Sequence, residues 1–520
     1  MTEPGGIGQA PAAAGRLLRL GATVVAAVSV LAGKAMIGMG IRRAPEGWRR
    51  TVGILLRSEA TRFALSAFGL RVPRADGEDD AIENRTALGL ASFLAHEPDA
   101  HFCLEWRRSV TIRRRVDFVD VAVLQFADDG LRTITPYLAA SGPPAPAPDG
   151  QARAHEALVT AYNRTAGLPE AERCRSLLEQ VRTTGGDGRS QAYARRLLAA
   201  CCLSFEPLDP SDPSQRFRPP QFAARRGLGL GYLTWVARPD NGGSVDLWVS
   251  AHHVGLDGVP LQDLLDRLER AWGTTAVVAF PPALAGRPFA GPQPCHAPGE
   301  RAVDHLTTFL DLSPVLALRR RLNAQYGGAV GGEVTFGALL AWLLNQEPEF
   351  AGVRIASTVD VAASGGYERD VDVVPLRPAD YATGSGPWGG FVEFAREFNR
   401  LIAASRTRTS PLRAGMQTAG LLPPWAHATI VGSDPAALDV TFGSLCVTIV
   451  RGARVFVAPM TDFGLGHGFL AIGSASLPST DGTRVASISI KGDAGRISHY
   501  PAILQRMIDR SARLQTDSVS

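Results

Sequence analysis

Ser250-Ala251-His252-His253-Val254-Gly255-Leu256-Asp257-Gly258 lies near the middle of the chain, and the surrounding sequence is arranged around it. The alternating run 245–249 before it predicts a strand, and residues 260–268 after it carry leucines at helical spacing. His253 therefore stands where a strand passes into a helix, with Asp257 four residues later. A strand end can present an imidazole at the edge of a cleft, and a neutral imidazole accepts a proton readily near pH 7.

The spelling HHxxxDG, read at His252, His253, Asp257 and Gly258, resembles the signature of the chloramphenicol-acetyltransferase-like superfamily. This group of acyltransferases includes the plant BAHD enzymes, the condensation domains of peptide synthetases and the dihydrolipoyl acyltransferase cores. The resemblance implies that His253 is the general base and that the acceptor attacks a thioester directly. It also implies that Asp257 orients the turn by pairing with an arginine and that His252 is a packed or orienting residue. Gly258 would permit a tight passage from strand to helix. The alternative is a chance pair of histidines in a loop.

Composition limits the classes of function. The 520 residues are enough for two or three domains, and 45% of them are hydrophobic. A formal charge of +4 is small for this length and argues against nucleic-acid binding through phosphate contacts. The six cysteines show no CxxC spacing, which predicts a reducing, cytoplasmic compartment and no metal site. Cys201 and Cys202 fall in an apolar run, 195–203, that we expect to be helical and buried.

Residues 1–80 predict an N-terminal extension, disordered at first and then made of apolar and amphipathic helices. The fourteen uncharged residues 20–33 would span about 21 Å as a helix, less than the roughly 30 Å of a bilayer core. Three interpretations of residues 16–41 stay open: a helix packed on protein, a helix on the membrane surface, and a signal anchor. A basic amphipathic stretch, 45–70, follows. Residues 16–70 therefore predict contact with a partner protein or with the inner face of the membrane.

Two internal matches predict that the rest of the chain is a duplicated unit. Residues 90–98 match 340–348 with five identities at an offset of 250, and residues 227–233 match 464–470 at an offset of 237. We expect two α/β units, 85–275 and 301–515. With the family resemblance, they imply a tandem pair of chloramphenicol-acetyltransferase-like α/β sandwich domains, a pseudo-dimer. The expected boundaries are 81–278 for the first half, 279–300 for a crossover linker and 301–520 for the second half.

The second half is expected to be degenerate. Aligning Pro260 with Pro501 places His253 opposite Ala494 and Asp257 opposite Ser498, so both motif residues are lost there. This pattern predicts a single active site at the seam between the halves.

Two further segments of the second half carry candidate residues. The run 462–466 resembles the DFGWG element of BAHD enzymes, which implies a structural role for Asp462, Gly464 and Gly466. In related cores a hydroxyl of the second half serves the oxyanion. Thr429 and Ser433 lie in the corresponding segment and are candidates, although a plain turn fits the segment equally well.

The resemblance implies an acyltransferase that uses an acyl-CoA or acyl carrier protein thioester as co-substrate and has no permanently bound cofactor. Its acceptor would be a hydroxyl or amine on a small molecule or lipid. Two alternatives remain: a non-catalytic relative that binds a carrier or scaffolds a complex, and a membrane-associated lipid acyltransferase. An intact HHxxxDG in only one half favours the enzyme over the binding protein. The sequence does not name the donor or the acceptor.

Overall fold

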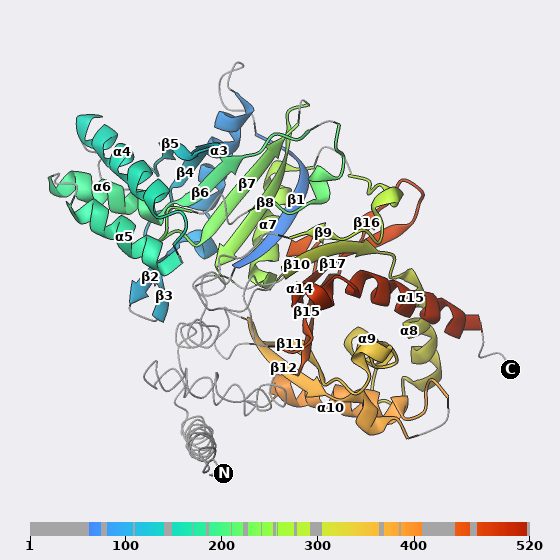
Figure 1. Cartoon of the computed structure of the whole chain (residues 1–520). Coiled ribbons are helices and arrows are strands. Elements are labelled where there is room, and N and C mark those ends of the chain that lie inside the picture. Colours follow the sequence, from blue (N-terminus) through green and yellow to red (C-terminus); the bar gives the residue numbers. More distant parts are fainter. Residues whose placement is uncertain are drawn as a thin grey trace, which may run out of the picture.

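The computed structural model shows two α/β halves side by side, drawn in blue to green and in yellow to red in Figure 1. The residues that it describes are 62–73, 81–107, 110–139, 148–168, 170–183, 187–209, 211–221, 227–240, 242–252, 256, 258–274, 278–291, 304–362, 369–383, 386–407, 443–457 and 465–516. The α/β class predicted from the sequence is confirmed.

The first half is built on a seven-stranded sheet with the order β14-β1-β8-β7-β6-β4-β5. A separate hairpin, β2–β3, and helices accompany this sheet, with α4, α5 and α6 at its outer edge (Figure 1). The elements in chain order are β1 (Arg62–Arg71), α3 (Ile82–Ala95), β2 (Phe102–Arg107), β3 (Val110–Arg115), β4 (Val121–Ala127), β5 (Gly130–Tyr137), α4 (Pro148–Arg164), α5 (Glu170–Thr183), α6 (Gly188–Ala199), β6 (Cys201–Phe205), β7 (Leu233–Pro239), β8 (Ser244–His252) and α7 (Gly258–Trp272).

The second half is built on a sheet with the order β12-β11-β13-β15-β17-β10-β9, with β16 added on β17. Its elements are β9 (Phe289–Ala290), β10 (Asp304–Leu310), α8 (Ser313–Tyr326), α9 (Phe336–Asn345), β11 (Ile355–Ala362), β12 (Arg369–Leu376), α10 (Phe391–Thr407), β13 (Leu445–Val450), β14 (Phe456–Val457), β15 (Gly468–Gly473), β16 (Leu477–Pro478), β17 (Arg484–Gly492), α14 (Ala494–Ile497) and α15 (Tyr500–Thr516). Strand β14 leaves this half and joins the first sheet beside β1.

The two sheets have the same succession of strand pairs. The first begins with the antiparallel pair β5–β4, continues with the parallel pairs β4–β6 and β6–β7, and ends with three antiparallel pairs. The second follows the same pattern from β12 and β11 through β13, β15, β17 and β10 to β9. Thus β8, which carries the histidines, corresponds to β17, and α7 corresponds to α15.

The structure corrects two expectations about local structure. Residues 62–71, expected in a helical extension, form strand β1, which pairs with β8 and is buried along most of its length. The expected helix 195–203 is instead the end of α6 followed by β6, on which Cys201 and Cys202 are buried free thiols. A strand buried on both faces reads as a continuous apolar run, which periodicity alone does not distinguish from a buried helix.

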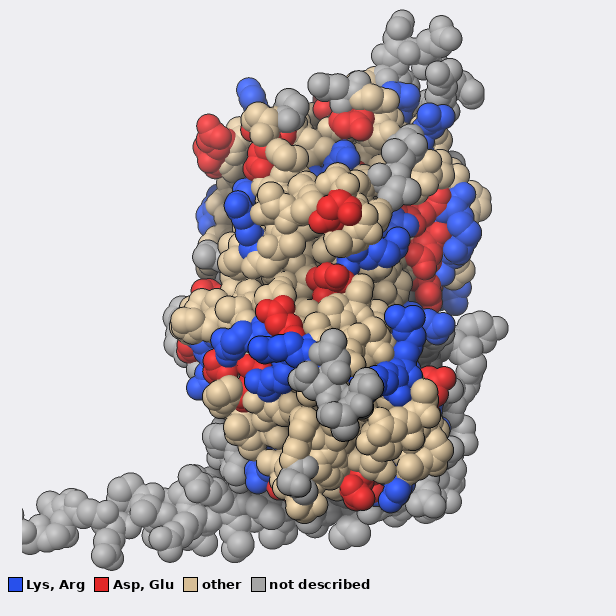
Figure 2. Space-filling view, turned by 90° about the vertical axis from the view of Figure 1, so that its right-hand side faces the viewer, with Lys and Arg blue, Asp and Glu red and all other residues tan. Residues whose placement is uncertain are grey.

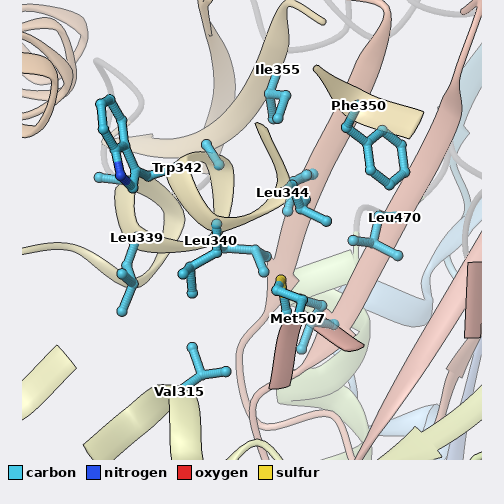
Figure 3. Close-up of a cluster of buried hydrophobic side chains, with 14 of the residues drawn as sticks. Val315, Leu339, Leu340, Trp342, Leu344, Phe350, Ile355, Leu470 and Met507 are labelled. Carbon is cyan, nitrogen blue, oxygen red and sulfur yellow. The ribbon is translucent and has the colours of Figure 1, made fainter. Parts of the chain in front are cut away.

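The second half has its own apolar core between its sheet and helices α8, α9, α10 and α15. Helix α9 lies at the centre of this core and is buried almost all round. In Figure 3 its leucines lie between Val315 of α8, Met507 of α15, and Ile355 and Leu470 of the sheet. A separate core spans both halves and contains α3, α7, one face of the first sheet, and Cys446, Val450, Phe456 and Phe469 of the second half.

Charged side chains of both signs are interspersed on the face shown in Figure 2. Within the described residues, no helix has the length and apolar content needed to cross a bilayer. The membrane or partner contact is expected at residues 16–70. Of these, 62–70 belong to strand β1, and 16–61 lie outside the described residues.

Candidate active site

The histidine motif begins at the buried end of β8. His252 is fully buried and lies opposite Arg62 of β1 in the sheet register. Its backbone N–H donates to the carbonyl oxygen of Tyr232 at 2.8 Å, and its carbonyl oxygen accepts from Leu256 N–H at 3.1 Å. His253 and Asp257 themselves lie outside the described residues. The elements on both sides of them are β8 and α7, as the sequence predicts.

Gly258 is the first residue of α7. Its backbone is not in the left-handed region, and a Cβ built on it would lie 3.9 Å from Val450 Cγ1, an ordinary contact. The passage from strand to helix therefore does not require glycine at this position for its backbone conformation, contrary to our expectation. The contact does show that β13 of the second half meets the start of α7.

Helix α7 continues along the second half beyond its first turn. A Cβ at Gly452 would lie 3.1 Å from Gln262 Cγ, which is one turn into the helix. Farther along, Arg454 Nη2 donates to Glu269 Oε2 at 2.9 Å. Burial raises the pKa of Glu269, and the Arg454 guanidinium opposes this effect. The segment 450–454 thus runs alongside α7, from near its N-terminus at Val450 to near its C-terminus at Arg454.

The sheet register corrects the alignment of the two halves at the motif. Leu233 pairs with Ala251 in the first sheet, and the corresponding Leu470 pairs with Ile490 in the second. His252 therefore corresponds to Lys491, and the residue equivalent to His253 is Gly492, not Ala494. The discrepancy arises because the short helix α14 lies between β17 and α15, whereas α7 begins soon after β8.

Part of the DFGLG segment is described. The carbonyl oxygen of Gly466 accepts from Arg496 Nη1, and a Cβ on Gly466 would meet no atom within 4 Å. Its carbonyl therefore makes a structural bond, but steric room does not require a glycine. Asp462 and Gly464 lie outside the described residues, as do the oxyanion candidates Thr429 and Ser433.

A pair of threonines that the sequence did not single out lies on the second sheet. Thr358 Oγ1 of β11 and Thr448 Oγ1 of β13 are 2.6 Å apart, and both side chains are half-buried. Thr448 lies two residues before Val450, so its side chain is on the same face of β13. Only the parallel pairing of β11 with β13 brings the two hydroxyls together, and no local sequence pattern indicates it.

The side chain of Arg62, on β1, reaches across the motif strand β8 to the start of β7. It is buried, and its Nη1 lies 3.3 Å from the carbonyl oxygen of Tyr232 and 3.5 Å from Thr234 Oγ1. Burial raises the pKa of the Cys202 thiol to about 11, although the guanidiniums of Arg173 and Arg62 act in the opposite direction. This end of the first sheet is therefore rich in buried positive charge.

No protein-family model and no curated protein sequence matches the chain. Among solved structures, the chain is similar to trichothecene 15-O-acetyltransferase from Fusarium sporotrichioides, with 11% identity, a TM-score of 0.44, and coverage of 90% of this chain and 94% of that one. The first condensation domain of the CDA synthetase matches with 13% identity, a TM-score of 0.40, and coverage of 91% and 96%.

A shorter match involves the dihydrolipoamide acetyltransferase of Azotobacter vinelandii, with 17% identity and a TM-score of 0.26. It covers 41% of this chain and 83% of that one. These three solved structures are two acetyltransferases and a condensation domain.

Proposed function

We propose that the protein transfers an acyl group from a CoA or carrier-protein thioester to a hydroxyl or amine acceptor. The observation that carries this proposal is the position of the motif. In the sequence, His253 and Asp257 lie between β8 and α7, and Val450 of the other half shares an apolar core with Leu261 of α7. A site between two halves allows donor and acceptor to approach one base from different sides while water is excluded.

In this mechanism the neutral imidazole of His253 accepts the proton of the acceptor O–H or N–H. The acceptor atom attacks the thioester carbonyl carbon and forms a tetrahedral oxyanion. Collapse of this intermediate breaks the carbon–sulfur bond, and the departing thiolate takes the proton from the imidazolium. The products are the ester or amide and a free thiol, and the base is regenerated. An imidazole suits both proton transfers because its pKa lies near neutrality.

We assign Arg62 as the arginine that pairs with Asp257 and fixes the turn after the histidines. Arg62 lies directly opposite His252, so it is the buried cation nearest to the motif along the described sheet. The pair would hold the segment that presents His253, as the family resemblance implies. Neither residue would take part in proton transfer.

A hydroxyl of the second half would donate to the oxyanion, because such donors stabilise charge that develops in the transition state. Thr429 and Ser433 remain the candidates from the sequence, and we add Thr448. Its strand contacts the start of α7, and only one of the two hydroxyl hydrogens of the Thr358–Thr448 pair is used between them. The second hydrogen can be donated to a substrate oxygen.

The test is thioester turnover by the purified full-length protein. We would incubate it with acetyl-CoA, longer acyl-CoAs and acyl carrier thioesters, together with alcohol and amine acceptors. Free thiol would be followed with a chromogenic thiol reagent and the acylated product by mass spectrometry. We expect thiol release that depends on the acceptor. If the protein retains a carrier or an acyl-CoA but consumes no thioester, the non-catalytic binding function is correct instead.

A pair of variants tests the assignment of Arg62. Asp257→Asn and Arg62→Met should each lower kcat, because either change frees the turn that presents the base. If the two residues act as a pair, the double variant should lose little more than either single variant. Losses in kcat that multiply in the double variant would show that Arg62 does not act through Asp257.

A further inference from the structure

Arg173, on α5, is a fully buried guanidinium that forms no ion pair with a described residue. Its Nη1 donates to the carbonyl oxygen of Gly227 at 2.7 Å, and its Cζ lies 5.3 Å from the centre of the Tyr162 ring. Nε and Nη2 are buried and have no hydrogen-bond partner among the described residues. One edge of the guanidinium is therefore left without an acceptor.

That edge is the one with which other arginines of this chain bind carboxylates. Through Nε and Nη2, Arg196 donates to Asp120 and Arg238 donates to Glu206. Arg267 uses the same two nitrogens to donate to Glu97 and Asp99. Two parallel N–H bonds from this edge to the oxygens of one carboxylate are the strongest geometry that an arginine offers. In Arg173 the Nε and Nη2 atoms are buried as well, but no carboxylate of a described residue accepts from them.

An uncompensated charge in the interior is strongly unfavourable, because its loss of hydration is not offset by a partner. The carbonyl of Gly227 and the ring of Tyr162 satisfy only part of the guanidinium. An anion that supplies two acceptor oxygens would satisfy the remaining edge. The distance from Arg173 to the histidine motif indicates the source of such an anion.

A chain of contacts leads from Arg173 to the histidine motif. A Cβ at Gly227, whose carbonyl binds Arg173, would lie 3.2 Å from Thr234 Oγ1. Arg62 Nη1 lies 3.5 Å from the same hydroxyl, and Arg62 is opposite His252. Arg173 also acts on Cys202 of β6, and β6 is two strand spacings, about 10 Å, from β8. A small molecule that reacts at the motif can span this distance.

We propose that the Nε–Nη2 edge of Arg173 binds a carboxylate of the substrate, which makes this an acyltransferase for an anionic acyl group or an anionic acceptor. The proposal rests on the acyl-transfer function above and names its substrate class. Because the guanidinium is fully buried, binding requires the side chains over it to move. Two sources of the carboxylate are distinguished below: a dicarboxylic acyl-CoA and an acidic acceptor.

The first experiment measures binding without turnover. Thermal unfolding of the full-length protein would be followed in sodium succinate, sodium malonate and sodium chloride at equal ionic strength. We expect the dicarboxylates to raise Tm by about 2 °C over chloride, because a ligand that binds only the folded state stabilises it. Arg173→Met should abolish this rise. Arg182→Met, an exposed position on the same helix, should retain it.

The proposal is overturned if succinate and malonate act like chloride in the wild-type protein. It is also overturned if Arg173→Met shows the same rise in Tm. This experiment needs no acyl transfer, so its failure is distinct from a failure of the proposed function, which would appear as absent thioester consumption.

The second experiment identifies which substrate carries the carboxylate. If it is the acyl group, Arg173→Met should lower kcat/KM for succinyl-CoA at least tenfold relative to acetyl-CoA. If it is the acceptor, the variant should raise KM for an amino acid acceptor and leave KM for the corresponding amide unchanged. Unchanged ratios for both pairs of substrates would contradict the assignment of Arg173.

Discussion

At the scale of single residues, Arg173 and Arg196 show what a buried guanidinium requires. Arg196 is buried on α6 and pairs with the equally buried Asp120, with Nη2 2.7 Å from Oδ1. Asp120 Oδ1 also accepts from Ala139 N–H at 2.6 Å, and Arg196 lies over the ring of Phe118. The charge of Arg196 is balanced by Asp120, whereas that of Arg173 has no carboxylate partner among the described residues.

Replacing each arginine by methionine should therefore have different effects on the free energy of unfolding. Arg196→Met leaves the Asp120 carboxylate buried without its cation and should lower the free energy of unfolding by about 3–5 kcal/mol. Arg173→Met removes a charge that has no carboxylate partner among the described residues. This variant should change the free energy of unfolding by less than about 1 kcal/mol, or raise it. Chemical denaturation in chloride buffer measures both. A loss of several kcal/mol in Arg173→Met would show that a group of the protein balances this charge.

At the scale of elements, arginines of the last long helix in each half form ion pairs with acidic residues of a turn, 97–99 in the first half and 347–349 in the second. Arg267 of α7 donates to Glu97 at 2.8 Å and to Asp99 at 3.1 Å. In the second half, Arg506 of α15 donates to Glu347 and Glu349, and Arg510 pairs with Glu347 at 3.1 Å. Glu97 and Glu347 are the same position of the internal match at an offset of 250.

The ion pairs of Arg506 and Arg510 in the second half should contribute more to stability than those of Arg267. The Glu347 side chain is only 1% exposed, so replacing Arg506 and Arg510 together by methionine leaves a buried carboxylate without a cation. We expect the free energy of unfolding to fall by about 3 kcal/mol. Arg267→Met should cost about 1 kcal/mol. Its partners Glu97 and Asp99 are 14% and 44% exposed, so water screens these ion pairs more than those of Glu347. Equal costs in denaturant titrations would contradict this explanation.

Some of these elements can be predicted from the sequence, and others cannot. The passage from strand to helix at the motif follows from the alternating run before it and the helical spacing of the leucines after it. Strand β1 could not be recognised, because its partners β8 and β14 are distant in sequence and β14 comes from the other half. The Thr358–Thr448 pair and the unbalanced edge of Arg173 depend in the same way on long-range packing.

At the scale of the whole molecule, the second half contributes a strand and apolar side chains to the first half. Strand β14 adds to the first sheet, with Phe456 opposite Leu65. Phe456, Val450 and Phe469 share one apolar core with α7 and the first sheet. The halves are therefore joined by a sheet pairing and a common core as well as by the Arg454–Glu269 ion pair.

This arrangement predicts that the halves lose structure together. Phe456→Ala removes a buried ring from the shared core and should cost about 3–5 kcal/mol. Hydrogen exchange followed by mass spectrometry should then show faster exchange in β8 of the first half as well as in β15 of the second. Faster exchange confined to the second half would show that the first sheet does not depend on β14.

The central claim is that His253 is the base of an acyl transfer, and its most direct test is turnover by His253→Ala. We expect this variant to keep the wild-type circular dichroism spectrum and Tm but to lose a factor of about 10² to 10⁴ in kcat. His252→Ala should keep more activity and lose more stability, because His252 is fully buried. Wild-type turnover by His253→Ala on a thioester that the unmodified protein consumes would contradict the claim.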